Sequence, residues 1–223
     1  MSAPLHIPPE QRYAAADAKY ASTLSTLSEK QKMLAGLPYD PSDADLRKAI
    51  YRVRKLFRTF NSSEGRDEQD GNPAMTTERR QLFAQILGVQ EEQMASNVYV
   101  EPPFWCDYGT NIKLQGNFYC NFNTTILDCA EVIIGDGVLF GPNGGNVTIM
   151  AGVTIGRGCT IGAGSTVTKS IPDWSIALGS PAKVLRTLSE QERGDVNQKA
   201  NWGWAEKAAA SAGDDAAKKE KEI

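Results

Sequence analysis

The chain has 223 residues, of which 41% are hydrophobic and 23% charged, as in an ordinary globular protein with one sizeable core. Its net charge of −3 gives no general attraction to nucleic acid or anionic membranes, and no apolar run resembles a membrane span or a signal peptide. We therefore expect a cytoplasmic protein that binds neither nucleic acid nor membrane.

Histidine and cysteine, which often carry catalysis or metals, are scarce. The one histidine, His6, lies in the Pro-rich segment PLHIPPE, a poor place for an ordered catalytic group. No CxxC pattern occurs, so we expect no metal site and interpret the cysteines as free, mostly buried thiols. They are Cys106, Cys120, Cys129 and Cys159.

The first 97 residues predict a leader followed by helices. We expect a mobile leader over 1–28 and a helical segment over 29–97, interrupted by a polar loop at 61–75. Within that segment, Glu29–Ala35 suits a short helix closed by a glycine, and PYDPSDADL suits a turn into an N-capped helix. Thr77–Leu87 suits a third helix.

The helix after PYDPSDADL combines an apolar stripe with a basic surround. The stripe recurs at spacings of three and four, typical of an amphipathic helix, at Leu46, Ile50, Val53, Phe57 and Phe60. The surrounding cations are Arg47, Lys48, Arg52, Arg54, Lys55 and Arg58. We interpret them as a solvated helix face, with a subunit or ligand contact as the alternative.

Residues 98–188 change to β-branched residues, glycine and asparagine, with few helix formers. Apolar residues return there every six positions, at Ile149, Ile155, Ile161 and Val167. Short strands at this period predict a parallel β-helix, in which each coil buries its apolar residues on the next. Over 189–223 we expect a flexible charged tail, either a loose helix or disordered, with Trp202 and Trp204 as its only anchors.

The six-residue period fails once, within FGPNGGNVTIM. Phe140 follows Ile134 by six positions, but the next inward residue, Ile149, comes nine positions after Phe140. Two outcomes are open. Either the solenoid rejoins across GPNGGN with a short bulge, or its faces are rotated by half a period.

Long phrases of the sequence are specific to a known family. EPPFWCDYGTNIKLQGNFYCNFNTTILDCAEVIIGDGVLFGPN resembles the first coils of the hexapeptide-repeat acyltransferases, in their maltose and galactoside O-acetyltransferase branch, which includes nodulation-type acetyltransferases. GVTIGRGCTIGAGSTVTKSIPDWSIALGSPAKVLR resembles their last coils, and EKQKMLAGLPYD with DADLRKAIYRVRKLFRTFN their N-terminal helices. The resemblance, from Glu29 to about Arg186, implies a mainly β fold, a left-handed parallel β-helix preceded by a small α-helical segment.

The resemblance also implies an activity. Such enzymes transfer an acetyl group from acetyl-CoA to a hydroxyl of a sugar or sugar-like acceptor, without a covalent intermediate, at sites between the subunits of a homotrimer. A histidine acts there as general base, because the alcohol must lose its proton as it attacks the thioester.

Several site residues are implied by position. Asp40 and Asn121 match acceptor-binding positions, although a turn residue and a stacked solenoid asparagine are the alternative interpretations. Ala163 matches a position whose backbone lies against the pantetheine arm of CoA. The positions near the nucleotide end of CoA match Thr168, Lys169, Lys183 and Arg186, for which an ordinary basic rim is the alternative.

The histidine segment of the family has no counterpart in this chain. Asn143 is followed at once by Gly144, where the family carries roughly thirty more residues, a solenoid turn and the loop with the base. We therefore expect no catalytic residue of the family type. Asp128, Glu131 and Asp136 lie on neighbouring coils, but a carboxylate of pKa ~4 is a weak base for this reaction.

Three interpretations follow. The chain is an O-acetyltransferase whose sequence has lost an internal segment through alternative splicing or a gene-model error. Alternatively, it is a real shortened protein, either an inactive trimeric scaffold or a CoA-binding pseudoenzyme. In the third interpretation it is an enzyme that uses another base. The abrupt join between two intact phrases favours the first, because slow divergence would blur the flanking sequence.

Overall fold

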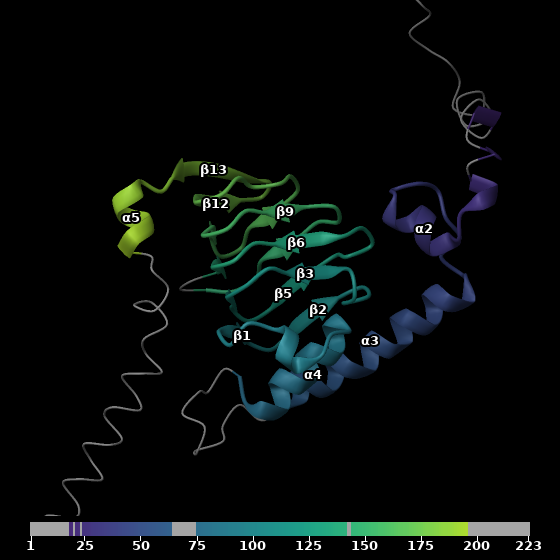
Figure 1. Cartoon of the computed structure of the whole chain (residues 1–223), viewed down its shortest axis with the longest axis horizontal. Helices are drawn as coiled ribbons and strands as arrows, with labels where there is room; N and C mark the ends of the chain where they lie inside the picture. The colour runs from purple at the N-terminus through teal and green to yellow at the C-terminus, as the bar shows by residue number, and fades with distance from the viewer. Residues whose placement is uncertain (1–17, 20, 23, 64–74, 142–143, 196–223) are drawn as a thin grey trace, which may run out of the picture. The chain divides into compact units, whose positions relative to one another are not determined.

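The computed structural model is mainly β, with helices before the strands (Figure 1). It describes residues 18–19, 21–22, 24–63, 75–141 and 144–195. The predicted features at His6, Asn143, Trp202 and Trp204 therefore lie outside the described residues. The chain divides into two compact units between Lys48 and Ala49. In the described part, no helix is long and apolar enough to cross a membrane.

The helices begin and end where the sequence supplies caps. Their bounds are α2 Glu29–Leu34, α3 Ala44–Ser62, α4 Thr77–Leu87, the 3-10 helix η1 Glu91–Gln93 and α5 Glu190–Asp195. Ser28 and Gln31 cap α2 reciprocally, each side chain accepting from the other's backbone N–H. The Thr76 hydroxyl caps the start of α4, and Gly88, at a φ of +70°, ends it.

The amphipathic stripe of α3 is buried as predicted except at Ile50, which is half-buried. Leu46, Val53 and Phe60 are at most 2% exposed. Five of the six cations around the stripe are exposed, as a solvated face requires, but Arg52 is not. Its guanidinium donates to the Gln85 and Ile86 carbonyls at the end of α4, at 2.6 and 3.1 Å, where a cation also offsets the helix dipole.

The strands are two to six residues long and follow one another at short intervals. Their bounds are β1 Val98–Val100, β2 Phe104–Cys106, β3 Ile112–Leu114, β4 Phe118–Cys120, β5 Thr124–Ile126, β6 Val132–Ile134, β7 Val138–Phe140, β8 Thr148–Ile149, β9 Thr154–Ile155, β10 Thr160–Ile161, β11 Thr166–Val167, β12 Ser175–Gly179 and β13 Ala182–Thr187.

These strands stack into three sheets, the three faces of a solenoid (Figure 1). Sheet A has the order β1-β4-β7-β10-β12, with β13 antiparallel at its end. Sheet B has the order β11-β8-β5-β2, and sheet C has the order β3-β6-β9. Successive strands of the chain thus visit the three faces in turn, and the predicted left-handed parallel β-helix is confirmed.

The interior of the solenoid is a continuous column of apolar side chains. On sheet A, the residues in register from coil to coil are all 0% exposed: Val100, Cys120, Phe140, Ile161 and Ala177. Each large side chain buried in this way contributes about 1.5–3 kcal/mol. The four cysteines are free, three of them buried and Cys129 half-buried, as predicted.

The phase break is absorbed without rotating the faces. Phe140 pairs with Cys120 in the preceding coil and with Ile161 in the following one. Ile149, nine positions on, pairs in the same way with Ile126 and Val167 on sheet B. All of these side chains are at most 1% exposed. Of the two predicted outcomes, the short bulge is therefore confirmed.

Glycines allow the bulge to fit between coils. The Gly144 N–H donates to the Gly141 carbonyl at 2.9 Å, and the Asn146 N–H donates to the Phe122 carbonyl at 3.1 Å. Gly145 lies so close to the preceding coil that a Cβ there would stand 1.8 Å from the Phe122 carbonyl oxygen. At Gly145 the backbone thus packs directly on the backbone of the preceding coil, and a side chain at this position would force the two apart.

A buried carboxylate holds the turn between β2 and β3. Asp128 is 0% exposed and accepts from the backbone N–H groups of Asp107 and Tyr108, both at 2.9 Å, and of Asn111, at 3.3 Å. Burial raises the pKa of Asp128 because it disfavours the charged form, and the three N–H donors offset this only in part.

Replacing Asp128 by Ala should lower the free energy of unfolding by roughly 2–4 kcal/mol, because three buried N–H groups lose their acceptor. Asp128→Asn retains Oδ1, which accepts two of these bonds, and should cost less. Urea denaturation of both variants measures the difference. An Asp128→Ala variant as stable as the parent would contradict this role.

Gly145→Ala should destabilise the junction by roughly 1–3 kcal/mol, because the added methyl would collide with the Phe122 carbonyl. Gly144→Ala is the matched control, since its Cβ would meet only the Ala163 methyl, at 3.0 Å. Thermal unfolding followed by circular dichroism compares the two. Equal Tm values would show that the bulge is not packed as described.

Candidate functional site

Two of the sequence-predicted site residues, Asn121 and Ala163, lie along one edge of the solenoid. We call this edge the A–B corner, the line of turns where each coil passes from sheet A to sheet B. It comprises residues 101–103, 121–123, 141, 144–147 and 162–165. The Asn121 N–H donates to the Phe140 carbonyl at 3.1 Å, which joins its coil to the next. Asn121 and Ala163 are thus two coils apart, roughly 10 Å at ordinary strand spacing.

The Asn121 side chain supports this corner from within. It is 7% exposed, its Oδ1 accepts from the Phe122 N–H at 2.8 Å, and its Nδ2 donates to the Gly141 carbonyl at 2.7 Å. This is the arrangement that the alternative interpretation, a stacked solenoid asparagine, predicts. Each end of the amide keeps capacity for one further hydrogen bond.

Ala163 lies beside the junction on a surface with almost no side chains. Its Cβ stands 3.0 Å from where a Cβ of Gly144 would be, and the Gly164 N–H donates to the Gly145 carbonyl at 3.0 Å. Exposed backbone of this kind can bind an extended ligand that carries amide groups, because unobstructed N–H and C=O groups match those of the ligand.

Two exposed apolar side chains stand beside this surface. Phe122 is 50% exposed, and its Cδ2 would lie 2.9 Å from a Cβ at Gly145. Leu178 is 44% exposed, and its Cβ would lie 2.7 Å from a Cβ at Gly162. The A–B corner therefore combines bare backbone with apolar flanks, while its described polar side chains are amides, a hydroxyl and, at its far end, the carboxylate of Glu101.

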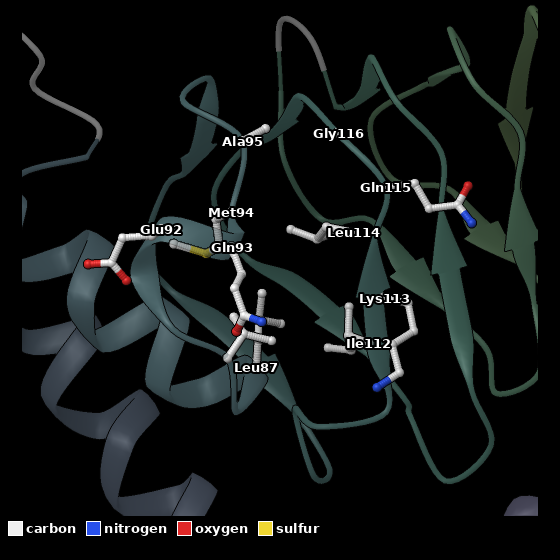
Figure 2. Close-up of a pocket in the computed structure, with 11 residues that line it drawn as sticks. Leu87, Glu92, Gln93, Met94, Ala95, Ile112, Lys113, Leu114, Gln115 and Gly116 are labelled. Carbon is white, nitrogen blue, oxygen red and sulfur yellow. The ribbon is translucent and has the colours of Figure 1, made fainter.

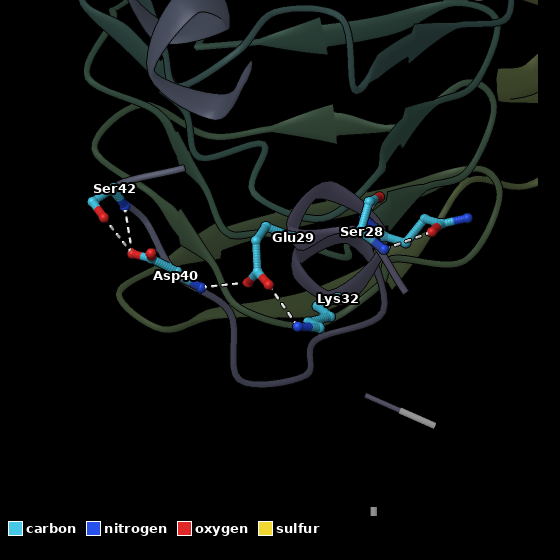
Figure 3. Close-up of polar contacts among 6 residues, drawn as sticks. Ser28, Glu29, Lys32, Asp40 and Ser42 are labelled. Carbon is cyan, nitrogen blue, oxygen red and sulfur yellow. Dashed lines mark hydrogen bonds and ion pairs between the residues drawn. The ribbon is translucent and has the colours of Figure 1, made fainter. Parts of the chain in front are cut away.

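Asp40 is held by local contacts in the unit that ends at Lys48 (Figure 3). Its Oδ1 accepts from the Ser42 N–H at 2.8 Å and the Ser42 hydroxyl at 2.7 Å, and its own N–H donates to Glu29 at 2.6 Å. The hydrogen bonds from Ser42 hold the pKa of Asp40 below its usual range. Asp40 is thus an exposed, ionised turn residue.

The predicted nucleotide-end residues lie near the C-terminal end of the solenoid. Thr168 and Lys169 follow β11, and Lys183 and Arg186 lie on β13; all four are exposed. The turn between β12 and β13 is held to β11, because the Ser180 hydroxyl donates to the Thr166 hydroxyl at 2.9 Å.

Arg186 has an intramolecular partner that the sequence analysis missed. Its two terminal nitrogens contact the two carboxylate oxygens of Glu192 in α5, at 2.9 and 2.8 Å. This contact, with hydrogen bonds from Ser189, lowers the pKa of Glu192 to about 2. The S-x-x-E spacing of Ser189 and Glu192, a capping-box pattern, was the available signal for the helix.

No general base of the expected kind lies among the described residues. The chain's one histidine is outside them. Of the carboxylates considered from the sequence, Asp128 is occupied by backbone N–H groups, and Asp136 Oδ1 accepts from the Asn117 N–H at 2.7 Å. Glu131 is exposed. Within the described ranges, no group of three or more potential metal ligands occurs.

A pocket of about 500 Å³ lies elsewhere, between η1 and β3 (Figure 2). Its apolar lining includes Leu87, Met94, Ile112 and Leu114, and none of the sequence-predicted site residues lines it. The pocket and the A–B corner are therefore different features of the fold.

Hexapeptide coils preceded by a helical segment define the class of hexapeptide-repeat transferases. Residues 32–89 match the family model of the maltose acetyltransferase hexapeptide capping motif, and residues 131–169 match that of the bacterial transferase hexapeptide with six repeats. The chain belongs to the hexapeptide-repeat acetyltransferase family.

Two relatives align with most of this chain over most of their own length. A putative acetyltransferase of Schizosaccharomyces pombe is 34% identical, over 73% of this chain and 93% of its own length. Nodulation protein L of Rhizobium meliloti is also 34% identical, over 71% of this chain and 98% of its own length.

Solved structures resemble the fold as well. A hexapeptide-repeat acetyltransferase of Vibrio cholerae, complexed with acetyl coenzyme A, matches with a TM-score of 0.56 and 28% identity, over 74% of this chain and 100% of that one. A galactoside acetyltransferase in complex with coenzyme A matches with a TM-score of 0.55 and 29% identity, over 75% and 94%.

The alignments contain positions that this chain does not fill. The alignment with the S. pombe protein spans 196 positions but covers 73% of 223 residues, or about 163, which leaves about 33 unmatched. The alignment with nodulation protein L spans 193 positions but covers 71% of this chain, or about 158 residues, which leaves about 35 positions unmatched. The predicted missing segment has this size, and its place after Asn143 stays a prediction.

The contact between Arg186 and Glu192 predicts an acid-dependent attachment of α5. A carboxyl whose folded pKa is depressed stabilises the fold above its ordinary pKa, so this contribution should be lost as the pH falls from about 4.5 toward about 2. Titration of the Glu192 carboxyl by NMR measures the pKa. Arg186→Gln should move it upward, and a pKa unchanged by that substitution would contradict the pairing.

Proposed function

We propose that the A–B corner and the cations after it form a site for acetyl-CoA. The observation that carries the proposal is the stacking of Asn121, the Gly144–Gly145 backbone and Ala163 on successive coils. The pantetheine arm, an extended chain with two amides, suits bare backbone flanked by apolar side chains. Lys169, Lys183 and Arg186 would then attract the phosphates. The complexes of similar acetyltransferases with CoA support this assignment.

The acceptor would be a hydroxyl of a sugar or sugar-like molecule, by similarity to the galactoside acetyltransferase. Asp40 and Asn121 are the proposed acceptor-binding residues. Asp40 can accept a hydrogen bond from a hydroxyl at Oδ2, which has no hydrogen-bond partner within the described residues. Asn121 can add one bond at each end of its amide.

Binding both substrates would not suffice for transfer. The hydroxyl must lose its proton as it attacks the thioester, and a positioned base typically contributes about 10²–10⁴-fold. The described side chains of the A–B corner, apart from Glu101 at its far end, are neutral. We therefore propose that this chain, as it stands, is a CoA-binding pseudoenzyme of the acetyltransferase family.

A second candidate is the O-acetyltransferase activity itself, in a longer form of the protein. Two alignments with about 33 and 35 unfilled positions favour it, as do the intact phrases on either side of the junction. The inserted segment would supply the base. Reading the gene between the codons for Asn143 and Gly144 distinguishes the two, since a skipped in-frame exon there would support the longer form.

The third interpretation, a different base within this chain, has less support. Asp128 is buried and committed to backbone N–H groups, and Asp136 accepts from the Asn117 N–H. Homotrimeric assembly, with sites between subunits, is proposed from the family resemblance. A cytoplasmic location is proposed from composition alone.

Purified protein should bind CoA but release none from acetyl-CoA in the presence of a mono- or disaccharide. Calorimetry measures binding, and a thiol reagent measures release. Lys169→Ala combined with Arg186→Ala should weaken binding at least tenfold, because two phosphate contacts are lost. The matched control, Lys55→Ala with Arg58→Ala on α3, removes the same charge and should bind normally.

Each half of this experiment can contradict the proposal separately. Sugar-dependent CoA release above the protein-free rate would mean that the chain is an active enzyme. Absence of CoA binding to the parent protein would mean that the A–B corner is only a structural edge of the solenoid.

A further inference from the structure

The contact between Arg186 and Glu192 lies within the proposed CoA site. Arg186 NH1 and NH2 each meet one carboxylate oxygen of Glu192, at 2.9 and 2.8 Å, so the guanidinium is engaged in a bidentate pair. This pair uses the end-on edge of the guanidinium, one of the edges that can bind a phosphate in a bidentate manner. A phosphate of CoA that approached this edge would compete with the carboxylate.

The carboxylate is held in place independently of Arg186. Glu192 Oε2 also accepts from the Ser189 N–H at 2.8 Å and the Ser189 hydroxyl at 3.0 Å, while the Glu192 N–H donates to that hydroxyl. These bonds form a capping box at the start of α5. They fix the carboxylate against β13, so it does not swing away freely when a ligand approaches.

A second contact attaches the same helix to the last coil. The Arg193 guanidinium lies 5.7 Å from the centre of the Trp174 ring, and its Nε donates to the Leu188 carbonyl at 3.0 Å. The Leu188 N–H in turn donates to the Trp174 carbonyl at 2.7 Å. Glu192 is thus a fixed negative charge beside the proposed nucleotide end, rather than a mobile surface group.

We infer that Glu192 is a specificity-determining residue, which lowers the preference of the CoA site for phosphate-bearing ligands over the pantetheine part alone. The inference rests on the proposed CoA site. Of three proposed phosphate-binding cations, one is neutralised by a carboxylate that also repels an incoming phosphate. Affinity then depends more on the bare backbone of the A–B corner and less on the nucleotide end.

The decisive variant is Glu192→Gln in the full chain. Glutamine can still form the capping box with Ser189, so α5 should remain attached, but the charge that holds Arg186 is removed. Glu190→Gln is the matched control, because Glu190 is an exposed carboxylate on the same helix with no ion pair in the described part of the chain.

Calorimetric titrations at low salt would compare CoA, dephospho-CoA and, by competition, pantetheine. We expect Glu192→Gln to tighten CoA binding by about 3- to 10-fold and to leave pantetheine unchanged, while Glu190→Gln changes neither. If Glu192→Gln tightens the binding of dephospho-CoA as much as that of CoA, Arg186 lies at the diphosphate. If it tightens the binding of CoA but not that of dephospho-CoA, Arg186 lies at the 3′-phosphate.

A double variant tests whether the effect passes through Arg186. In an Arg186→Gln background, Glu192→Gln should give less than a twofold gain. An unchanged CoA-to-pantetheine ratio in the single variant would overturn the inference. So would weaker CoA binding, which would mean that Glu192 orients Arg186 for the ligand. If neither CoA nor pantetheine binds any variant, the proposed CoA site itself fails.

Discussion

The fold depends on the register between coils. Each strand of the solenoid pairs through backbone hydrogen bonds with strands of the neighbouring coils, about twenty residues away. Cys120, for example, pairs with Val100 and Phe140. A coil that returned one residue out of phase would turn its apolar side chains toward solvent, because neighbouring residues of a strand face opposite sides. Every insertion or loss must therefore be absorbed in a corner, where backbone hydrogen bonds can be remade.

The junction after Phe140 illustrates this constraint. Its surplus residues would break any strand, but they lie in a corner, where Gly145 can approach the Phe122 carbonyl closely. The same packing places Gly144 against Ala163 and the Asn121 amide against Gly141. The solenoid is thus continuous across the junction, and Asn121 and Ala163 of the proposed site lie along one edge of it.

Local signals in the sequence predicted most elements because they need no knowledge of distant partners. Thr77–Leu87 was predicted to the residue, since Thr76 caps its start and Gly88 ends it. The inward positions Ile149, Ile155, Ile161 and Val167 followed from periodicity and are all fully buried. The role of Arg52 could not be predicted, because its acceptors on α4 lie more than thirty positions away.

By itself, the sequence determined the solenoid, its helical segment and the place of the phase break, because six-residue periodicity and capping are local patterns. The family followed from the resemblance of long phrases to those of known acyltransferases. Only the tertiary structure decided how the break closes, which amide supports the A–B corner and what Arg186 contacts. The bulge and the rotated faces both satisfied the local pattern, and burial of Ile149 in register with Ile126 and Val167 selects the bulge. Arg186 meets Glu192 because α5 returns against β13, an approach that no spacing along the chain encodes.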